Sequence, residues 1–299
     1  MRYFLYIATN FKKVKMSQLR IGTCSWKYDS WKGLVYSDSS KPNYLKEYSD
    51  KYNTVEIDQW FWSLFKGKKI ALPRANVAAA YGASVPENFR FTIKMPNSIT
   101  LTHFYDKDSE GNLIENPYFL SEDVFASTIH NLWGMKEKIA FLMFQFEYLN
   151  KQKMPSIGLF IDKLKSFMEK TDPQYRYAIE IRNPNYLQKE FFQFLKETNI
   201  TPVLLQGYYM PPIDETIDSW RDYFGGNLII RLHGPDRSVI EGKTKGIWNK
   251  IVEPKDAELL RIMVKVKDLL ERGIDIYLNV NNHYEGSAPL TIEKIRKLF

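Results

Sequence analysis

Cysteine and histidine are scarce in this sequence. Its 299 residues include one cysteine, Cys24, and four histidines. A single cysteine excludes an internal disulfide framework and a metal site built from several thiolates. Because no secretory signal is visible, the lone thiol also fits a reducing compartment, and we expect a cytoplasmic protein.

Long apolar runs are absent as well. A membrane-spanning helix needs about 18 consecutive apolar residues, and no stretch approaches that length, so we expect no membrane partner. A short apolar run at 4–8 is followed by lysines, which reverses the charge order of a secretory signal. We therefore treat residues 1–18 as an N-terminal extension, with translation starting at Met1 or Met16, and residues 19–299 as one domain.

The charge balance leaves nucleic acid open as a partner. Lysine and arginine number 42 against 35 acidic residues, which gives a net charge of +7. The densest basic runs, at 12–15 and 66–69, are more simply solvated surface, because the excess is spread along the chain. No glycine-rich phosphate loop, nucleophile elbow or kinase motif accompanies them.

What the sequence does contain is a regular alternation of short apolar strands with longer amphipathic segments. Strands are predicted at 20–26, 54–58, 90–95, 139–146, 177–182, 201–206, 228–233 and 275–281. Helices are predicted at 43–51, 66–82, 122–138, 158–170, 186–198, 215–223, 255–271 and 291–299, with Pro73 interrupting the second. Residues 101–121, 210–214 and 234–248 are expected to be loops. Eight such units predict a single-domain α/β fold, a closed (β/α)8 TIM-like barrel.

Polar side chains fall late in nearly every predicted strand. Glu180 and Arg182 share one face of their strand, because successive side chains point to opposite sides. The same alternation selects Glu56, Lys94, Gln145, Gln206, Arg231, His233, Asn279 and Asn281 on the other strands. Barrel enzymes build their sites at this end, where a purely structural barrel would place branched apolar residues. We therefore expect a ring of polar groups around the barrel mouth.

These residue types suit acid–base chemistry on an anion. Glu180, His233 and Glu56 are the candidate catalytic groups, since carboxyl and imidazole groups transfer protons. The candidate substrate-binding residues are Lys94, Arg182, Arg231, Asn279, Asn281 and Trp26. The alternative is a salt-bridge network that only neutralises charge inside the barrel.

A metal site is a further alternative. Glu56, Glu180 and His233 are of the ligand types that hold divalent ions in other barrels. There is no His-x-x-x-His pair and no histidine cluster, so we predict no cofactor and keep a divalent metal only as an alternative. Aromatic residues near the first two strands, such as Trp26 and Trp62, suit stacking on a ring, but they equally suit packing.

Ordered blocks of residues resemble one family. The blocks are Gly22-Thr-Cys-Ser-Trp26, Asn53-Thr-Val-Glu-Ile57, Lys94-Met-Pro96, Glu180-Ile-Arg182, Arg231-Leu-His-Gly234, and Asn281-Asn282 with Glu285-Gly286. Together they resemble the YecE-like proteins, also called domain of unknown function 72, over residues 21–290. The resemblance implies a TIM-barrel-like fold without an assigned activity. The chain departs from the family pattern at Cys24, Ser25 and Asp58.

Function is therefore predicted from the barrel mouth. The leading hypothesis is an enzyme, namely a hydrolase, lyase or isomerase, that acts on a small polar anionic substrate bearing phosphate or carboxylate. One alternative is a nucleic-acid-binding or nucleic-acid-processing protein, and a second is a non-catalytic ligand-binding barrel.

Overall fold

Eight parallel strands form the centre of the computed structural model, which describes residues 17–65, 69–234 and 236–299. The strands are β1 (Leu19–Thr23), β2 (Thr54–Ile57), β5 (Arg90–Lys94), β8 (Ile139–Gln145), β9 (Tyr177–Glu180), β10 (Thr201–Gly207), β11 (Asn227–Gly234) and β12 (Asp275–Val280). They are hydrogen-bonded in the order β1-β12-β11-β10-β9-β8-β5-β2. All eight predicted strands are confirmed, as is the TIM-like (β/α)8 barrel. The expected extension lies, up to residue 16, outside the described residues.

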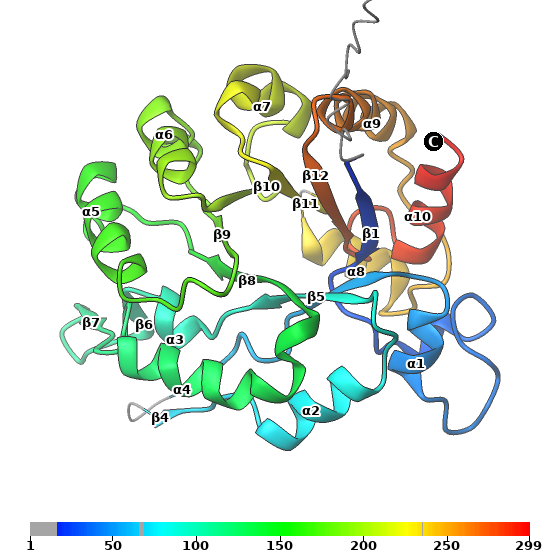
Figure 1. The fold of residues 1–299 in the computed structure, drawn as a ribbon, viewed down its shortest axis with the longest axis horizontal. Coiled ribbons are helices and arrows are strands. Elements are labelled where there is room, and N and C mark those ends of the chain that lie inside the picture. The colour runs from blue at the N-terminus through cyan, green and yellow to red at the C-terminus, as the bar shows by residue number, and fades with distance from the viewer. Residues whose placement is uncertain (1–16, 66–68, 235) are drawn as a thin grey trace, which may run out of the picture.

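Helices surround the strands, as Figure 1 shows. They are α1 (Tyr44–Ser49), α2 (Ala75–Ala83), α4 (Glu122–Leu132), α5 (Ile157–Met168), α6 (Lys189–Glu197), α7 (Ile213–Trp220), α9 (Asp256–Glu271) and α10 (Ala288–Arg296). Capping residues fix several of their starts. Ser121 accepts a hydrogen bond from the amide of Val124, and Ser156 accepts one from the amide of Leu159. No helix in the described ranges combines the length and hydropathy needed to span a membrane.

The period-two pattern of the strands divides the core into two parts. Side chains on the inner faces form a small apolar plug inside the barrel, made of Ala140, Phe141, Met143, Ala178, Val203, Ile229 and Tyr277. Side chains on the outer faces join the helices in a much larger core. The polar residues nearer the strand ends lie above the plug, on the side of the barrel mouth.

Three segments differ from the sequence prediction. The helix expected at 66–82 begins only at Ala75, since Pro73 precedes it and β4 (Lys69–Ile70) pairs with β3 (Leu64–Phe65) instead. The loop expected at 101–121 contains a hairpin of β6 (His103–Lys107) and β7 (Leu113–Glu115). The loop expected at 234–248 contains α8 (Arg237–Thr244), which Asp236 caps by accepting from the amide of Ser238.

The barrel has a seam between β1 and β2, which are the two edges of the hydrogen-bonded sheet. The hydroxyl of Tyr48, fully buried on α1, accepts a hydrogen bond from the amide of Thr23 (2.9 Å) and donates one to the carbonyl oxygen of Thr54 (3.1 Å). A side chain at Gly22 would overlap the same carbonyl oxygen, so only glycine permits this approach. Tyr48 thus joins the two strand edges through its side chain.

Candidate functional site

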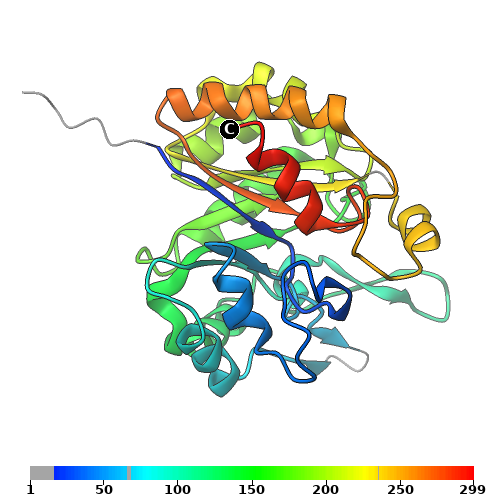
Figure 2. The ribbon, with the colours of Figure 1, turned by 90° about the vertical axis from the view of Figure 1, so that its right-hand side faces the viewer.

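The candidate site is a cleft of about 900 Å³ at the C-terminal end of the strands. Its floor is polar and includes Asp58, Lys94, Gln145, Arg182, Arg231, His233 and Asn281. Its rim includes Tyr105 of β6 and Arg237 of α8. Figure 2 shows the β6–β7 hairpin and α8 at the same end of the molecule. The two segments that were predicted to be loops therefore contribute to the mouth of the barrel.

Arg231 is the centre of a buried charge network. Its Nε and Nη2 donate to the two carboxylate oxygens of Glu56, each at 2.7 Å, and its Nη1 donates to Glu180 Oε2 at 2.5 Å. All three side chains are at most 1% exposed. Burial alone would lower the pKa of Arg231, but the charges of Glu180 and Glu56 raise it well above its ordinary value. The guanidinium is therefore permanently charged and fixed in place.

Arg182 extends this network toward the cleft. Its Nε donates to Glu180 Oε1 at 2.6 Å, so both oxygens of Glu180 are bound by arginine. Burial raises the pKa of Glu180, but the charges of Arg182, Arg231 and Lys94 outweigh it and lower the pKa below its usual value. The side-chain oxygen of Gln145 accepts from both arginines at 3.2 Å. Glu56 and Glu180 thus use all four carboxylate oxygens to hold arginines.

Lys94 differs from these arginines. It is 9% exposed at the end of β5, and its Nζ lies 3.6 Å from the ring centroid of Phe61. Within the described part of the chain it has no hydrogen bond or ion pair. Burial, followed by the charge of Arg231, lowers its pKa to about 8. The floor of the cleft therefore carries a cation that no carboxylate engages directly.

Asp58 directly follows β2, the strand next to β5, which ends with Lys94. The register pairs Ile57 of β2 with Ile93 of β5, so the next residue of each strand lies at the same level, and both line the cleft. Burial and the charge of Glu56 raise the pKa of Asp58 to about 6, although Lys94 acts in the opposite direction. A carboxyl group that titrates near neutral pH can both accept and donate a proton.

His233 is neutral in this environment. Burial, and then the charges of Arg231 and Arg182, lower its pKa well below the ordinary value. Its Nε2 lies 3.5 Å from Cys24 Sγ, while its buried Nδ1 has no hydrogen-bond partner among the described residues. Burial also raises the pKa of Cys24, so the thiol keeps its proton. One imidazole nitrogen is thus left without a hydrogen-bond partner in the described part of the chain.

A strained turn after β10 forms part of the wall. Gly207 has φ +124°, and the next two residues, Tyr208 and Tyr209, also have positive φ values of 51° and 63°. The ring of Tyr208 packs on the guanidinium of Arg182 at 4.6 Å, whereas Tyr209 is 95% exposed. Such strain is concentrated at functional sites.

The remaining predicted residues lie in different places. Asn281 lines the cleft and contacts His283 through its side-chain oxygen, 2.5 Å from Nδ1. Asn279 is completely buried below the cleft, and neither atom of its side-chain amide has a described partner. Trp26 is 5% exposed and packs edge-on against Tyr81, away from the cleft lining.

The predicted ring of inward-facing polar residues is wrong at Gln206. Its side chain faces outward, where it donates to Glu258 of α9 and accepts from the amide of Ile213. The inner position beside Arg231 is occupied by Leu205 instead. The ring is therefore interrupted at β10.

Sequence reasoning missed several residues of the site. The alternation places Asp58 on the same strand face as Glu56, two positions earlier, but Asp58 was not among the predicted site residues. Arg237 and the exposed aromatic residues of the rim come from segments whose position depends on tertiary structure. These aromatic residues are Tyr105, Tyr148 and Tyr209, whereas a fourth, Trp62, was already considered for ring stacking from the sequence.

Two of the three candidate metal ligands already have other partners in the structure. Glu56 and Glu180 are bound to arginines, which compete with a cation for the same oxygens. Within residues 17–65, 69–234 and 236–299 no group of three or more His, Cys, Asp or Glu side chains is arranged to hold a metal ion. The described donors therefore offer no ready ligand set.

Comparison with known proteins supports the fold. The model of the family described as "Protein of unknown function DUF72" matches residues 20–299. A DUF72 family protein from Enterococcus faecalis V583 is 19% identical with a TM-score of 0.66, over 94% of this chain and 95% of that one. A DUF72 family protein from Thermotoga maritima MSB8 is 21% identical with a TM-score of 0.64, over 94% and 98%. No curated protein matches the chain.

Proposed function

The chain belongs to the DUF72 family, whose description assigns no activity, and we propose a function from the residues of the cleft. We propose that the protein is an enzyme that acts by acid–base chemistry on a small anionic substrate. The observation that carries this proposal is Lys94, a buried cation at the cleft floor without a carboxylate partner in the described chain. A substrate carboxylate or phosphate would supply the direct ionic contact that Lys94 lacks in the described chain. Arg182, whose side chain is 16% exposed, adds a second positive group to the lining of the same cleft.

The proton-transfer roles follow from the surroundings of each group. Asp58 serves as the acid or base, since its pKa of about 6 lets it exchange a proton near neutral pH. His233 remains neutral and offers Nδ1 to a polar group of the substrate. Glu56 and Glu180 position Arg231 and Arg182, because their oxygens are already engaged. This assignment transfers the catalytic role predicted for the two glutamates to Asp58.

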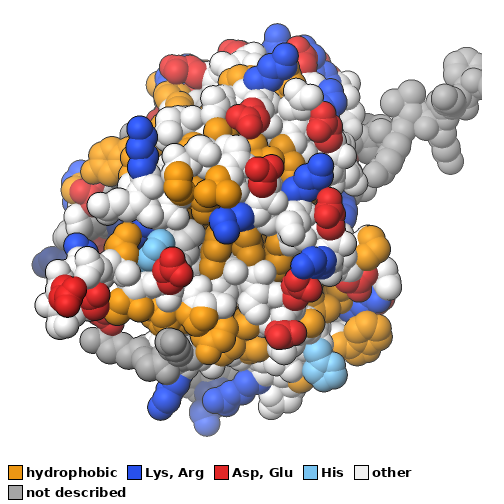
Figure 3. Space-filling model, turned by 90° about the vertical axis from the view of Figure 1, so that its left-hand side faces the viewer, with side chains coloured by type: hydrophobic (Ala, Val, Ile, Leu, Met, Phe, Trp, Pro, Cys, Tyr) orange, Lys and Arg blue, Asp and Glu red, His pale blue; other side chains and the backbone are white. Residues whose placement is uncertain are grey.

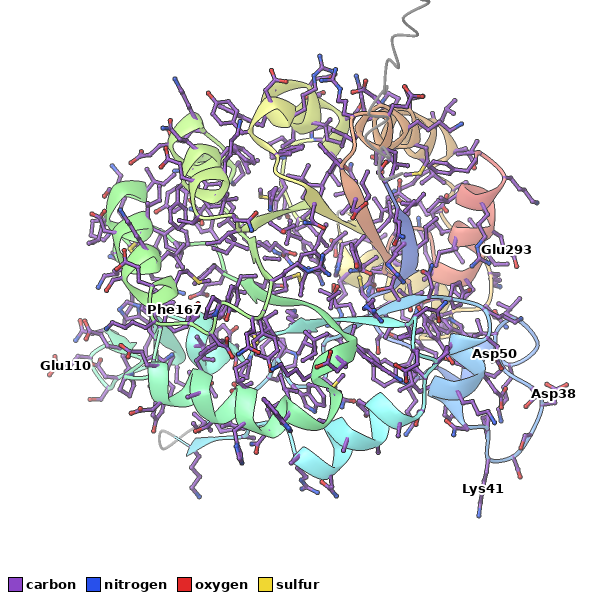
Figure 4. All side chains as sticks on the ribbon, viewed as in Figure 1. Asp38, Lys41, Asp50, Glu110, Phe167 and Glu293 are labelled. Carbon is purple, nitrogen blue, oxygen red and sulfur yellow. The ribbon has the colours of Figure 1, made fainter. Side chains whose placement is uncertain are left out.

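A ligand panel tests the anionic substrate. Thermal unfolding is measured at low salt with phosphate, sulfate, small dicarboxylates and sugar phosphates, and we expect some of these anions to raise Tm in a saturable way. Lys94→Met and Arg182→Met should each remove the shift. Lys41→Met is the matched control, because Lys41 points away from the molecule in Figure 4, and it should keep the shift. An unchanged response in Lys94→Met would contradict the proposal.

Turnover is tested separately from binding. Compounds that raise Tm are incubated with the protein, and products are sought by mass spectrometry. Asp58→Asn should retain the Tm shift but lose about 100-fold or more in rate. Binding without any product, across all compounds that bind, would instead indicate a non-catalytic ligand-binding barrel.

The exposed aromatic rim favours a second candidate, a protein that binds single-stranded nucleic acid. Trp62, Tyr105, Tyr148 and Tyr209 are each at least 59% exposed, and aromatic rings of this kind stack on bases. Figure 3 shows one side of the molecule, where acidic and basic side chains are intermingled. Fluorescence anisotropy with a labelled single strand decides the question, because phosphate contacts require affinity to fall steeply with salt.

A further inference from the structure

Lys94 has the surroundings of a reactive amine rather than of a structural ion-pair partner. It lies on the floor of the cleft, and no acceptor among the described residues binds its Nζ. We propose that Lys94 is a nucleophile that forms an imine with a small aldehyde or ketone bearing a carboxylate or phosphate. The inference rests on the proposed function, since it names the substrate class and the first covalent step for the same site.

The contacts of Lys94 hold its amine without occupying it. Phe61 lies under Nζ, with the ring centroid 3.6 Å away, and restricts where the end of the side chain can lie. An aromatic face attracts the ammonium form, but it does not hold the nitrogen as a carboxylate at hydrogen-bond distance would. By contrast, Arg182 and Arg231 are each bound to a glutamate. Among the cations of this floor that the structure describes, Lys94 is thus the one whose nitrogen no carboxylate binds.

The neighbouring groups match the needs of imine formation. The nitrogen lone pair of the neutral amine attacks the carbonyl carbon, and the electron pair of the C=O bond moves to oxygen. The nitrogen loses a proton and the oxygen gains one, which gives a carbinolamine. The carbinolamine then loses water and leaves a C=N bond, so the sum is amine plus carbonyl to imine plus water. Asp58, which lines the same cleft at the level of Lys94 on the neighbouring strand, is the group that we propose carries these protons.

The electrostatics of the site support the neutral amine. Burial and the nearby charge of Arg231 lower the pKa of Lys94 to about 8, although the charges of Glu56 and Glu180 act to raise it. At pH 7 this leaves roughly a tenth of Lys94 as the free amine, which is on the order of 100-fold more than for a lysine with an ordinary pKa of about 10.4. Arg182, at the side of the cleft, is placed to hold the anionic group of the substrate.

Reductive trapping tests the proposal on the intact protein. Glyoxylate, a small anionic aldehyde, is added at pH 7 with sodium cyanoborohydride, and labelled lysines are identified by peptide mass spectrometry. The exposed Lys41 provides an internal reference in the same molecule. We expect Lys94 to be labelled at least tenfold faster than Lys41, and Asp58→Asn to slow labelling of Lys94 alone. Labelling of Lys94 at or below the rate of Lys41 overturns the proposal.

A second arm separates this inference from the proposed function. Inorganic phosphate, which cannot form an imine, is added as a competitor, and we expect it to slow labelling of Lys94 but not of Lys41. If anions raise Tm while Lys94 stays unlabelled, the nucleophile is wrong and the anion site stands. If a neutral aldehyde labels Lys94 as fast as glyoxylate does and phosphate gives no protection, the nucleophile stands and the anionic substrate is wrong.

Discussion

Arg231 and Glu56 lie on strands far apart in the sequence, yet they form a two-pronged ion pair with both N–O distances at 2.7 Å. Neither side chain is more than 1% exposed. A planar guanidinium and a carboxylate match in this geometry, which fixes the orientation of both groups. The floor of the cleft is therefore held by a rigid ionic contact across the barrel.

Removal of one partner from this pair should strongly destabilise the protein. Glu56→Gln leaves the buried charge of Arg231 only partly compensated, and we expect a loss of about 3–5 kcal/mol in the free energy of unfolding, measured with urea. Lys170→Met is the control, because it breaks an exposed pair with Glu122 and should cost about 1 kcal/mol or less. Equal losses in the two variants would contradict the structural role of the buried pair.

The seam between β1 and β2 gives a second stability prediction. Tyr48→Phe removes the hydroxyl that links Thr23 to Thr54 and leaves buried backbone groups without that partner. We expect a loss of about 1–3 kcal/mol and faster hydrogen exchange at the Thr23 amide. Tyr148→Phe, at an exposed tyrosine, should change neither quantity. Unaltered protection of Thr23 in Tyr48→Phe would show that the bridge contributes little.

Asp58 and Lys94 should give opposite slopes of stability against pH. The native pKa of Asp58 is raised from 3.8 to about 6, so the native state binds more protons in that interval and stability falls as pH rises through it. The native pKa of Lys94 is lowered from 10.5 to about 8, so the unfolded state binds more protons there and stability rises with pH. Urea titrations of wild type, Asp58→Asn and Lys94→Met should show each slope disappear in the corresponding variant.

The coupling between these charges has a definite sign. Glu56 raises the pKa of Asp58 and Lys94 lowers it, so Lys94→Met should move the carboxyl titration of Asp58 to higher pH. Glu56→Gln, provided that it remains folded, should move it to lower pH. NMR of the side-chain carboxyl carbon measures both shifts, and movement of the two variants in the same direction would contradict the arrangement.

His233 should stay uncharged at pH values where an exposed histidine is protonated. Its pKa is lowered by burial and by the neighbouring cations, so its nitrogen-15 NMR signals should remain those of a neutral ring through pH 6. The unfolded state binds the proton more readily below its ordinary pKa of about 6.5, so this residue makes stability fall as pH falls below that value. His233→Gln should remove this part of the acid sensitivity.

Cys24 should affect the tautomer of the same ring. Its thiol lies 3.5 Å from Nε2, and if the thiol donates, the ring proton resides on Nδ1. Cys24→Ala removes this contact, and we expect the nitrogen-15 signals of the two ring nitrogens to move toward a different tautomer balance. Identical signals in the variant and in wild type would show that the thiol does not set the tautomer.

The strands and their inner faces could be predicted from sequence because both follow from local periodicity. Residues two apart, such as Glu56 and Asp58, had to share a face once the strand was identified. What the pattern could not show is which charges meet, because Glu56 contacts Arg231 only after the barrel closes. The carboxylates were therefore predicted as catalytic groups, and their contacts became visible only in the structure.

Other misses have a similar physical cause. Gln206 was expected at the mouth, but the inner face of β10 is occupied by Val203 and Leu205, and Gln206 instead meets α9. Trp26 follows β1 closely, but the chain leaves the strand there and the ring turns to Tyr81. For α8 a local signal was present, since Asp236 and Ser238 form an N-cap pair.

The hydrogen-bonding order of the strands also has a consequence for how the chain reaches this fold. β1 forms its backbone ladder with β12, the last of the eight strands, and not with β2, the next strand along the chain. During synthesis, the backbone ladder of β1 therefore cannot form until β12 has been made. We expect the ladder of β1 to form late in folding, with its apolar residues available to chaperones until the C-terminal segment emerges.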